Sequence, residues 1–114
     1  MNAKSPITTH ILDLGTGRPA DGVAVTLSKV LGGRKTLIAE GITDNDGRIM
    51  NWFDAPLDAG HHRLTFATGI WYQERGLETF FPEVSLDFHV ADTDAHYHVP
   101  LLLNQWGYST YRGS

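Results

Sequence analysis

Three histidines are the residues whose type and spacing first suggest chemistry in this 114-residue sequence. His96 and His98 lie two residues apart, and His10 lies in a separate N-terminal segment. The ordinary pKa of imidazole lies nearest neutrality among the side chains, so a histidine can accept and release a proton at physiological pH. These histidines are candidates for proton transfer, with a structural or surface role as the commoner alternative for a histidine in a strand.

The segment from His96 to Leu103 is predicted to be a strand that is apolar on both faces. Because alternate side chains of a strand point to opposite faces, one face carries Tyr97, Val99, Leu101 and Leu103 and the other carries His96, His98, Pro100 and Leu102. We expect the first face to line the core. A strand face or edge that is open to solvent usually carries charged residues, whereas the second face combines histidines with Pro100 and Leu102. We therefore expect a second subunit to cover this histidine face. An exposed face on a monomer is the alternative.

His10 and Arg48 have placements that suggest the same site. His10 lies in a predicted strand and faces away from Ile11, beside Leu12. Arg48 follows the turn Asp44–Gly47, which lacks the spacing and the distal Glu of a calcium loop. A guanidinium at the start of a strand can bind an anionic or carbonyl-rich ligand through two hydrogen bonds. A solvated surface arginine is the alternative.

Other kinds of site are disfavoured by what the sequence lacks. It contains no Cys, hence no thiolate ligand and no thiol nucleophile. His10, His96 and His98 can supply three nitrogens to zinc, but their spacing fits no closed zinc motif and no fourth ligand is evident. The sequence has no G-x-S-x-G elbow, phosphate loop or dinucleotide fingerprint. We therefore predict no metal and no organic cofactor.

The elements that must position these residues are short strands. Eight are predicted, bounded by Gly, Pro, Asn and Asp turns, at residues 7–14, 23–30, 35–42, 48–53, 61–68, 85–91, 96–103 and 106–112. Residues 70–77 have no strand pattern and can hold a short helix. This order indicates a single all-β domain, an antiparallel sandwich, over residues 1–114.

The composition restricts the kinds of partner that the protein is expected to bind and the compartment in which it is expected. The formal net charge is −4 and the nine basic residues are scattered, which argues against nucleic-acid binding. No segment has the roughly 20 apolar residues of a membrane span. The N-terminus shows no apolar signal-peptide region, so a cytoplasmic protein is expected, although a trimmed secreted form would look the same.

Three stretches resemble the 5-hydroxyisourate hydrolases, the transthyretin-related enzymes of purine breakdown. They are ITTHILDLGTGRPADGV (Ile7 to Val23), TDNDGR (Thr43 to Arg48), and the end of the chain from His96 to Ser114, with HYHVPLLL and YSTYRGS. The terminal Tyr-Arg-Gly-Ser is the most specific part, since the hormone carriers of the superfamily end differently. The resemblance covers essentially the whole chain. It implies a transthyretin-like sandwich of two four-stranded sheets, and a homotetramer with its sites in a central channel.

The resemblance also implies a reaction and its residues. The reaction is hydrolysis of 5-hydroxyisourate to 2-oxo-4-hydroxy-4-carboxy-5-ureidoimidazoline. By motif, His10, Arg48, His98 and Ser114 are expected to be catalytic, and Tyr111 to bind substrate together with His10 and Arg48. One of the two histidines would take the proton of water while the other, with Ser114, relays a proton, and Arg48 would stabilise negative charge. The alternatives are a transthyretin-like carrier and a zinc-binding or purely structural tetramer.

Overall fold

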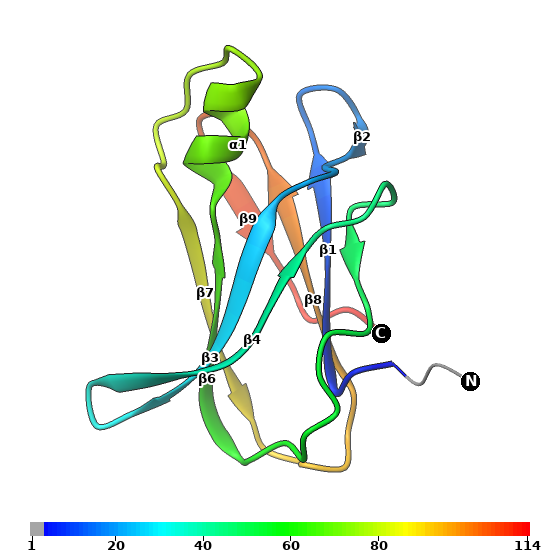
Figure 1. Ribbon diagram of the computed structural model, residues 1–114, viewed down its shortest axis with the longest axis vertical. Helices are drawn as coiled ribbons and strands as arrows, with labels where there is room; N and C mark the ends of the chain where they lie inside the picture. Colours follow the sequence, from blue (N-terminus) through cyan, green and yellow to red (C-terminus); the bar gives the residue numbers. More distant parts are fainter. Residues whose placement is uncertain (1–3) are drawn as a thin grey trace.

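Two β-sheets packed face to face form the molecule in the computed structural model, which describes residues 4–114 (Figure 1). The first sheet contains β1 (Ile7–Asp13), β2 (Arg18–Pro19), β5 (Arg48–Ile49), β8 (Tyr97–Leu103) and β9 (Tyr108–Thr110). The second sheet contains β3 (Ala24–Leu31), β4 (Arg34–Ile42), β6 (Gly60–Phe66) and β7 (Val84–Val90). The helix α1 (Thr68–Glu74) lies at one end of the sandwich. In the described part of the chain, no helix is long and apolar enough to cross a membrane.

The predicted sandwich with one short helix is confirmed, and its first sheet differs from the expectation in two details. Its order is β2-β1-β8-β9, with β5 also paired to β1, so it has five strands where four were expected. The pairing of β1 with β8 is parallel, and it runs from Ile7–Tyr97 to Asp13–Leu103. Side-chain alternation is the same in parallel and antiparallel strands, so the sequence pattern did not distinguish them.

The ends of three predicted elements were wrong for identifiable reasons. The strand expected at residues 48–53 stops at Ile49, because the chain then turns and the N–H groups of Trp52 and Phe53 donate to Ser5 Oγ. The helix begins earlier than predicted and ends at Glu74, shortly before Gly76 adopts a φ of 70°. The last strand is limited to Tyr108–Thr110, and the tail beyond it forms only an isolated bridge.

The core lies between the sheets and is built from the inward faces of alternating strands. The predicted core face of β8 is confirmed, because Tyr97, Val99, Leu101 and Leu103 are all buried. Ile7 and Ile11 of β1 are fully buried beside them, while His10 and Leu12 point to the opposite face and are half-buried. We call this opposite side of the first sheet, turned away from the second sheet, the outer face.

Candidate functional site

His10, Arg48 and His98 lie together on the outer face of the first sheet. His10 pairs with Arg48 of β5 on one side and with Pro100 of β8 on the other. His98 lies two residues before Pro100, so its side chain shares the outer face with that residue. Residues from the N-terminal, middle and C-terminal parts of the chain therefore meet across three adjacent strands.

The C-terminal tail continues across this face beside β8. The amide N–H of Gly113 donates to the carbonyl of His98 at 2.8 Å, and the two residues form a β-bridge. The pairing of Thr110 with Leu101 follows the same register, which places Tyr111 across from Pro100. Arg48, His10, Pro100 and Tyr111 thus form one row across four segments, which we call the histidine row. Ser114 follows Gly113 directly and is exposed.

Arg48 is held at the end of a hydrogen-bonded turn. Asp44 Oδ1 accepts the backbone N–H groups of Asp46 at 2.9 Å and of Arg48 at 3.0 Å. Gly47 has a φ of 73°, and a Cβ there would lie 2.5 Å from the carbonyl oxygen of Ile11, so only glycine fits. The Asp-x-x-Gly pattern therefore fixes the backbone of Arg48 against β1, while its guanidinium remains exposed.

A buried hydroxyl lies between the two C-terminal histidines. Thr8, which pairs with His98 across β1 and β8, is fully buried on the outer-face side. Its Oγ1 lies 2.7 Å from His98 Nδ1 and 3.1 Å from His96 Nε2. The two imidazoles are nearly parallel, with centroids 6.5 Å apart and an interplanar angle of 19°. His98 is therefore oriented by its Nδ1, and only its Nε2 is left for a ligand.

The electrostatic environment favours neutral imidazoles on this face. Burial and the neighbouring charge of Arg48 lower the pKa of His10 below its ordinary value, against a hydrogen bond to the backbone of Asp46. Burial also lowers the pKa of His98, and the charges of Arg48, His10, His96 and Lys4 act in the same direction. A neutral histidine beside a permanent cation can accept a proton while the cation stabilises an anion.

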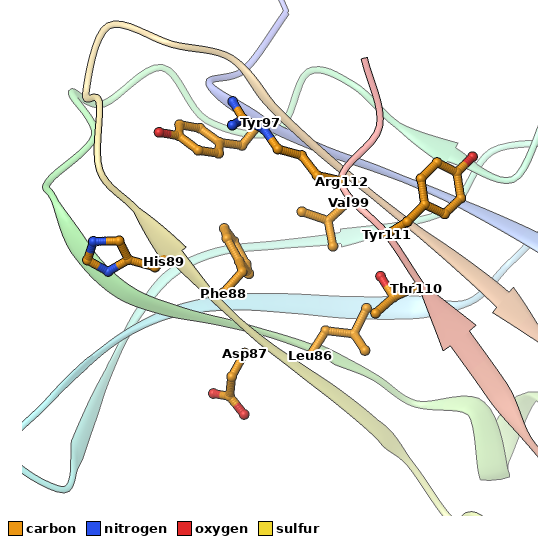
Figure 2. A pocket seen from close by; sticks show the side chains of 9 residues that line it. All are labelled: Leu86, Asp87, Phe88, His89, Tyr97, Val99, Thr110, Tyr111 and Arg112. Carbon is orange, nitrogen blue, oxygen red and sulfur yellow. The ribbon is translucent and has the colours of Figure 1, made fainter.

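The side chain of Arg112 does not share the face of the histidine row and instead points toward the space between the sheets. Its guanidinium carbon lies 4.5 Å from the centre of the Tyr97 ring, and its Nη2 donates weakly to the carbonyl of His96 at 3.5 Å. Figure 2 shows Arg112 and Tyr111 on opposite sides of the tail. Consecutive residues of the tail therefore serve different faces.

The pocket in Figure 2 is distinct from the place where His10, Arg48 and His98 meet, although Tyr111 is among its lining residues. It has a volume of about 320 Å³ and opens between the edge strands β7 and β9. Its walls include Leu86, Phe88 and Val99, with Arg112 at one side. His10, Arg48 and His98 are not among its lining residues. This pocket is therefore not the place where the predicted catalytic residues meet.

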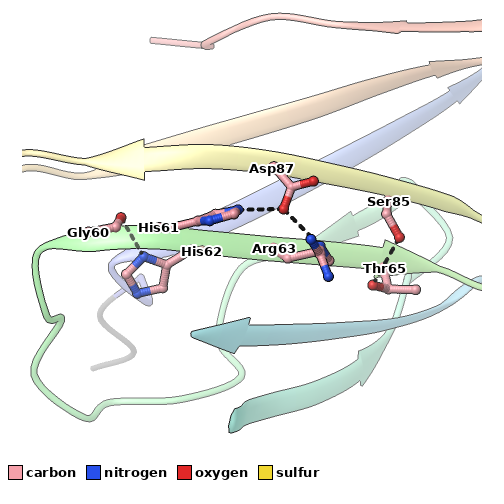
Figure 3. A network of polar contacts seen from close by, with 7 residues as sticks. All are labelled: Gly60, His61, His62, Arg63, Thr65, Ser85 and Asp87. Atoms are coloured by element: carbon pink, nitrogen blue, oxygen red, sulfur yellow. Dashed lines mark hydrogen bonds and ion pairs between the residues drawn. The ribbon is translucent and has the colours of Figure 1, made fainter. Parts of the chain in front are cut away.

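A second polar cluster lies on the exposed face of the other sheet (Figure 3). Asp87 Oδ1 accepts from Arg63 Nε at 2.8 Å and lies 2.6 Å from His61 Nε2. His62 points the other way, is fully buried, and has its Nδ1 3.1 Å from the carbonyl of Gly60. The two adjacent histidines therefore face opposite sides of the sheet. Within residues 4–114, no three metal-binding side chains are grouped closely enough to hold a metal ion.

Thr8 is the residue of this face that the sequence reasoning missed. Its signal was present, since Thr8 and His10 alternate in β1 and must share a face. The contact with His96 and His98 depends on the parallel pairing with β8, which was not predicted. A threonine in a strand is otherwise common for its β-branched shape alone.

Gly113 provides a test of the contact between the tail and His98. A Cβ at this position would lie 2.6 Å from His98 Cδ2, so Gly113→Ala must displace the ring or the tail. We expect turnover to fall about 10- to 100-fold, because small displacements of reacting groups are costly, with the melting temperature almost unchanged. Gly107→Ala is the matched control, since a Cβ there meets nothing within 4 Å. Equal activity of both variants would contradict a role for this contact.

Known proteins share this fold and much of this sequence. The HIUase/Transthyretin family model matches residues 7–113. The chain is 48% identical to the 5-hydroxyisourate hydrolase of Salmonella dublin over 109 residues, which is 95% of this chain and 80% of that protein. It is 41% identical to the 5-hydroxyisourate hydrolase of Deinococcus radiodurans, with both chains fully covered.

Two solved structures cover nearly the whole fold. The 5-hydroxyisourate hydrolase of Klebsiella pneumoniae matches with a TM-score of 0.83 and 44% identity, covering 95% of this chain and 98% of that one. Sea bream transthyretin in complex with thyroxine matches with a TM-score of 0.88 and 32% identity, covering 95% and 94%. Backbone similarity thus extends to both proteins, while sequence identity is higher with the hydrolase.

Proposed function

Because the chain belongs to the HIUase/Transthyretin family, we propose that it hydrolyses 5-hydroxyisourate, the compound named in its bacterial relatives. The observation that carries this proposal is the meeting of His10, Arg48 and His98 on the outer face of the first sheet. Two neutral imidazoles and a guanidinium suit the opening of a polar, carbonyl-rich ring by water.

We assign the steps of the hydrolysis to these residues as follows. His98 Nε2 takes a proton from water as the water oxygen attacks a ring carbonyl carbon. The guanidinium of Arg48 stabilises the negative charge that develops on the carbonyl oxygen. The ring C–N bond then breaks, and the nitrogen leaves with the proton that His98 took from water, relayed through His10 and Ser114, so both histidines end neutral. The carbonyl carbon ends as a carboxyl group, and Tyr111 packs against the planar substrate.

We further propose that the protein is a homotetramer whose outer faces meet around a central channel. The support is the mixture of histidines with Pro100 and Leu102 on this face, together with Tyr111, which is 57% exposed in the single chain. A partner chain would exclude water around the reacting groups and strengthen the charge interactions there. The site would then lie between subunits.

A carrier of a hydrophobic ligand is the less well supported alternative. The backbone resembles thyroxine-bound transthyretin closely, but the identity is 32%, against 41–48% for the hydrolases above. A row that contains His10, His98 and Arg48 presents proton acceptors and a cation, which a purely apolar ligand would leave unpaired.

The direct test is loss of 5-hydroxyisourate absorbance. The substrate is generated in the cuvette from urate by urate oxidase, and its decay is followed with and without this protein. We expect the protein to accelerate the decay in proportion to its concentration. A decay rate equal to that of the heat-denatured protein would overturn the proposed function.

The pH dependence of the reaction is expected to follow the histidines. Below its pKa, His98 carries a proton and cannot take one from water, so kcat/KM falls as the solution becomes acidic. Because burial and nearby positive charge lower the pKa of both His10 and His98, the midpoint of this fall should lie below the ordinary imidazole value of 6.5. A kcat/KM profile between pH 5 and pH 8 measures it. A midpoint above 6.5 would contradict the neutral state assigned here.

A further inference from the structure

Within residues 4–114, the hydroxyl of Thr8 is the group that lies within hydrogen-bond distance of both C-terminal imidazoles. It lies 2.7 Å from His98 Nδ1 and 3.1 Å from His96 Nε2. A threonine hydroxyl has a single proton, so it can donate to only one of these nitrogens and must accept from the other if both hydrogen bonds form. The full burial of Thr8 leaves no bulk water to replace either partner. The protonation patterns of the two rings are therefore linked through one oxygen.

Two arrangements satisfy these contacts when both histidines are neutral. In the first, Thr8 donates to His98 Nδ1, and His96 donates its Nε2–H to Thr8. His98 then carries its proton on Nε2, the nitrogen directed away from Thr8, and cannot take another proton there. In the second, His98 Nδ1–H donates to Thr8, and Thr8 donates to His96 Nε2. His98 Nε2 is then unprotonated and free.

Resting on the hydrolase function proposed above, we propose that Thr8 is a positioning residue whose hydroxyl accepts from His98 Nδ1–H and donates to His96 Nε2. This direction leaves His98 Nε2 as the atom that takes the proton from water. When that proton arrives, the Nδ1–H bond to Thr8 is already in place and becomes charge-assisted, so no hydrogen bond has to reverse. His96 serves as the acceptor that fixes the direction.

The surrounding charges support the neutral state of both rings that this arrangement requires. His96 must be unprotonated at Nε2 to accept from Thr8, and burial together with the charge of Lys4 lowers the pKa of His96. The groups that act on His98 are Arg48, His10, His96 and Lys4, and all of them disfavour its protonated form in the resting protein. Both rings are thus neutral near pH 7, the state in which a single hydroxyl proton can set both tautomers.

The first experiment reads the tautomer without substrate. The protein is labelled with ¹⁵N-histidine, and the His98 signals are assigned by their loss in His98→Asn. At pH 7.5 we expect a protonated Nδ1 and an unprotonated Nε2 for His98 in the wild-type protein. In Thr8→Val, which keeps the branched shape but removes the hydroxyl, the Nε2–H form should gain population.

The second experiment measures the effect of Thr8 substitutions on turnover. Thr8→Val should lower kcat about 10- to 100-fold, short of the about 10⁴-fold seen when a catalytic histidine is held in the wrong tautomer, because here the ring is released. KM should stay within about twofold, and Thr8→Ser, which restores the hydroxyl, should recover most of the lost kcat. Thr9→Val is the matched control. Thr9 is equally buried in the same strand, and its hydroxyl donates to the carbonyl of Val99 at 2.7 Å on the core side.

The outcomes separate this inference from the proposed function. A wild-type protein that does not hydrolyse 5-hydroxyisourate overturns the function. An active wild type with His98 protonated at Nε2 overturns the role of Thr8, whatever happens to the variants. Equal losses of kcat in Thr8→Val and Thr9→Val, or no rescue by Thr8→Ser, would show a merely structural effect and also overturn it.

Discussion

Replacing His98 by Asn is expected to lower kcat by about 10²- to 10⁴-fold, the range over which a positioned acid or base contributes to catalysis. Asparagine is polar and of similar width, but it cannot accept a proton from water near pH 7. His98 is half-buried on the outer face, so the change removes little of the core. The measurement is the initial rate with substrate generated in place, together with the melting temperature and the oligomeric mass in solution.

His89→Asn is the control for this substitution. His89 is also a strand histidine, but it is exposed on β7 in the second sheet and does not face the histidine row. We expect its kcat to stay close to that of the wild type. Near-normal turnover in His98→Asn, with the fold intact, would remove His98 from the mechanism and leave His10 as the candidate base.

Arg48→Met is expected to lower kcat by about 10²- to 10³-fold, the cost of removing one donor that stabilises a developing oxyanion. Arg48→Lys keeps the charge but lacks the planar fork, so it should recover only part of this loss. Because the charge of Arg48 helps to lower the pKa of His10 and His98, removing it should also move the acidic fall of kcat/KM to higher pH. This shift should be seen in the Met variant and be largely absent in the Lys variant.

Arg34→Met provides the comparison for loss of a positive charge alone. Arg34 is exposed at the start of β4, in the other sheet. Its replacement should leave both kcat and the pH profile unchanged. If Arg48→Met lowered kcat without any shift of the acidic limb, the electrostatic link between the guanidinium and the two histidines would be contradicted.

The alternation of apolar residues was enough to predict the faces of most strands. It separated Leu101 from Leu102 and Ile11 from Leu12, and the burial of these residues follows that division. Alternation carries this information because the side-chain period of a strand is two residues whatever lies next to it. The strand faces of His10 and His98 were therefore predictable from short stretches of sequence.

Which strands lie side by side was not predictable in the same way. The histidine row depends on the register in which distant segments pair. Alternation within one strand does not predict which strand lies next to it or in which register. The contact of Thr8 with His98 was not predictable for the same reason. Family resemblance supplied the residues of the site but not the hydrogen bonds that orient them.

Strand ends were decided by local side-chain contacts that a pattern of apolar residues does not encode. Residues 50–53 were predicted to continue the strand, yet the strand ends at Ile49 and the indole N–H of Trp52 donates to the carbonyl of Ile7. The opposing orientations of Tyr111 and Arg112 are also a property of the folded tail. A cation that stacks on Tyr97 was not evident from the sequence.

The parallel pairing of β1 with β8 has a consequence for how the protein folds during synthesis. The paired strands are 90 residues apart in the chain, as the Thr8–His98 contact shows. The β1 strand emerges early and must wait, with Ile7 and Ile11 uncovered, until β8 has been made. The β3–β4 and β6–β7 pairs join nearer segments and carry a smaller loop-closure cost. The second sheet can therefore form first, and the histidine row is completed in the last stage of folding.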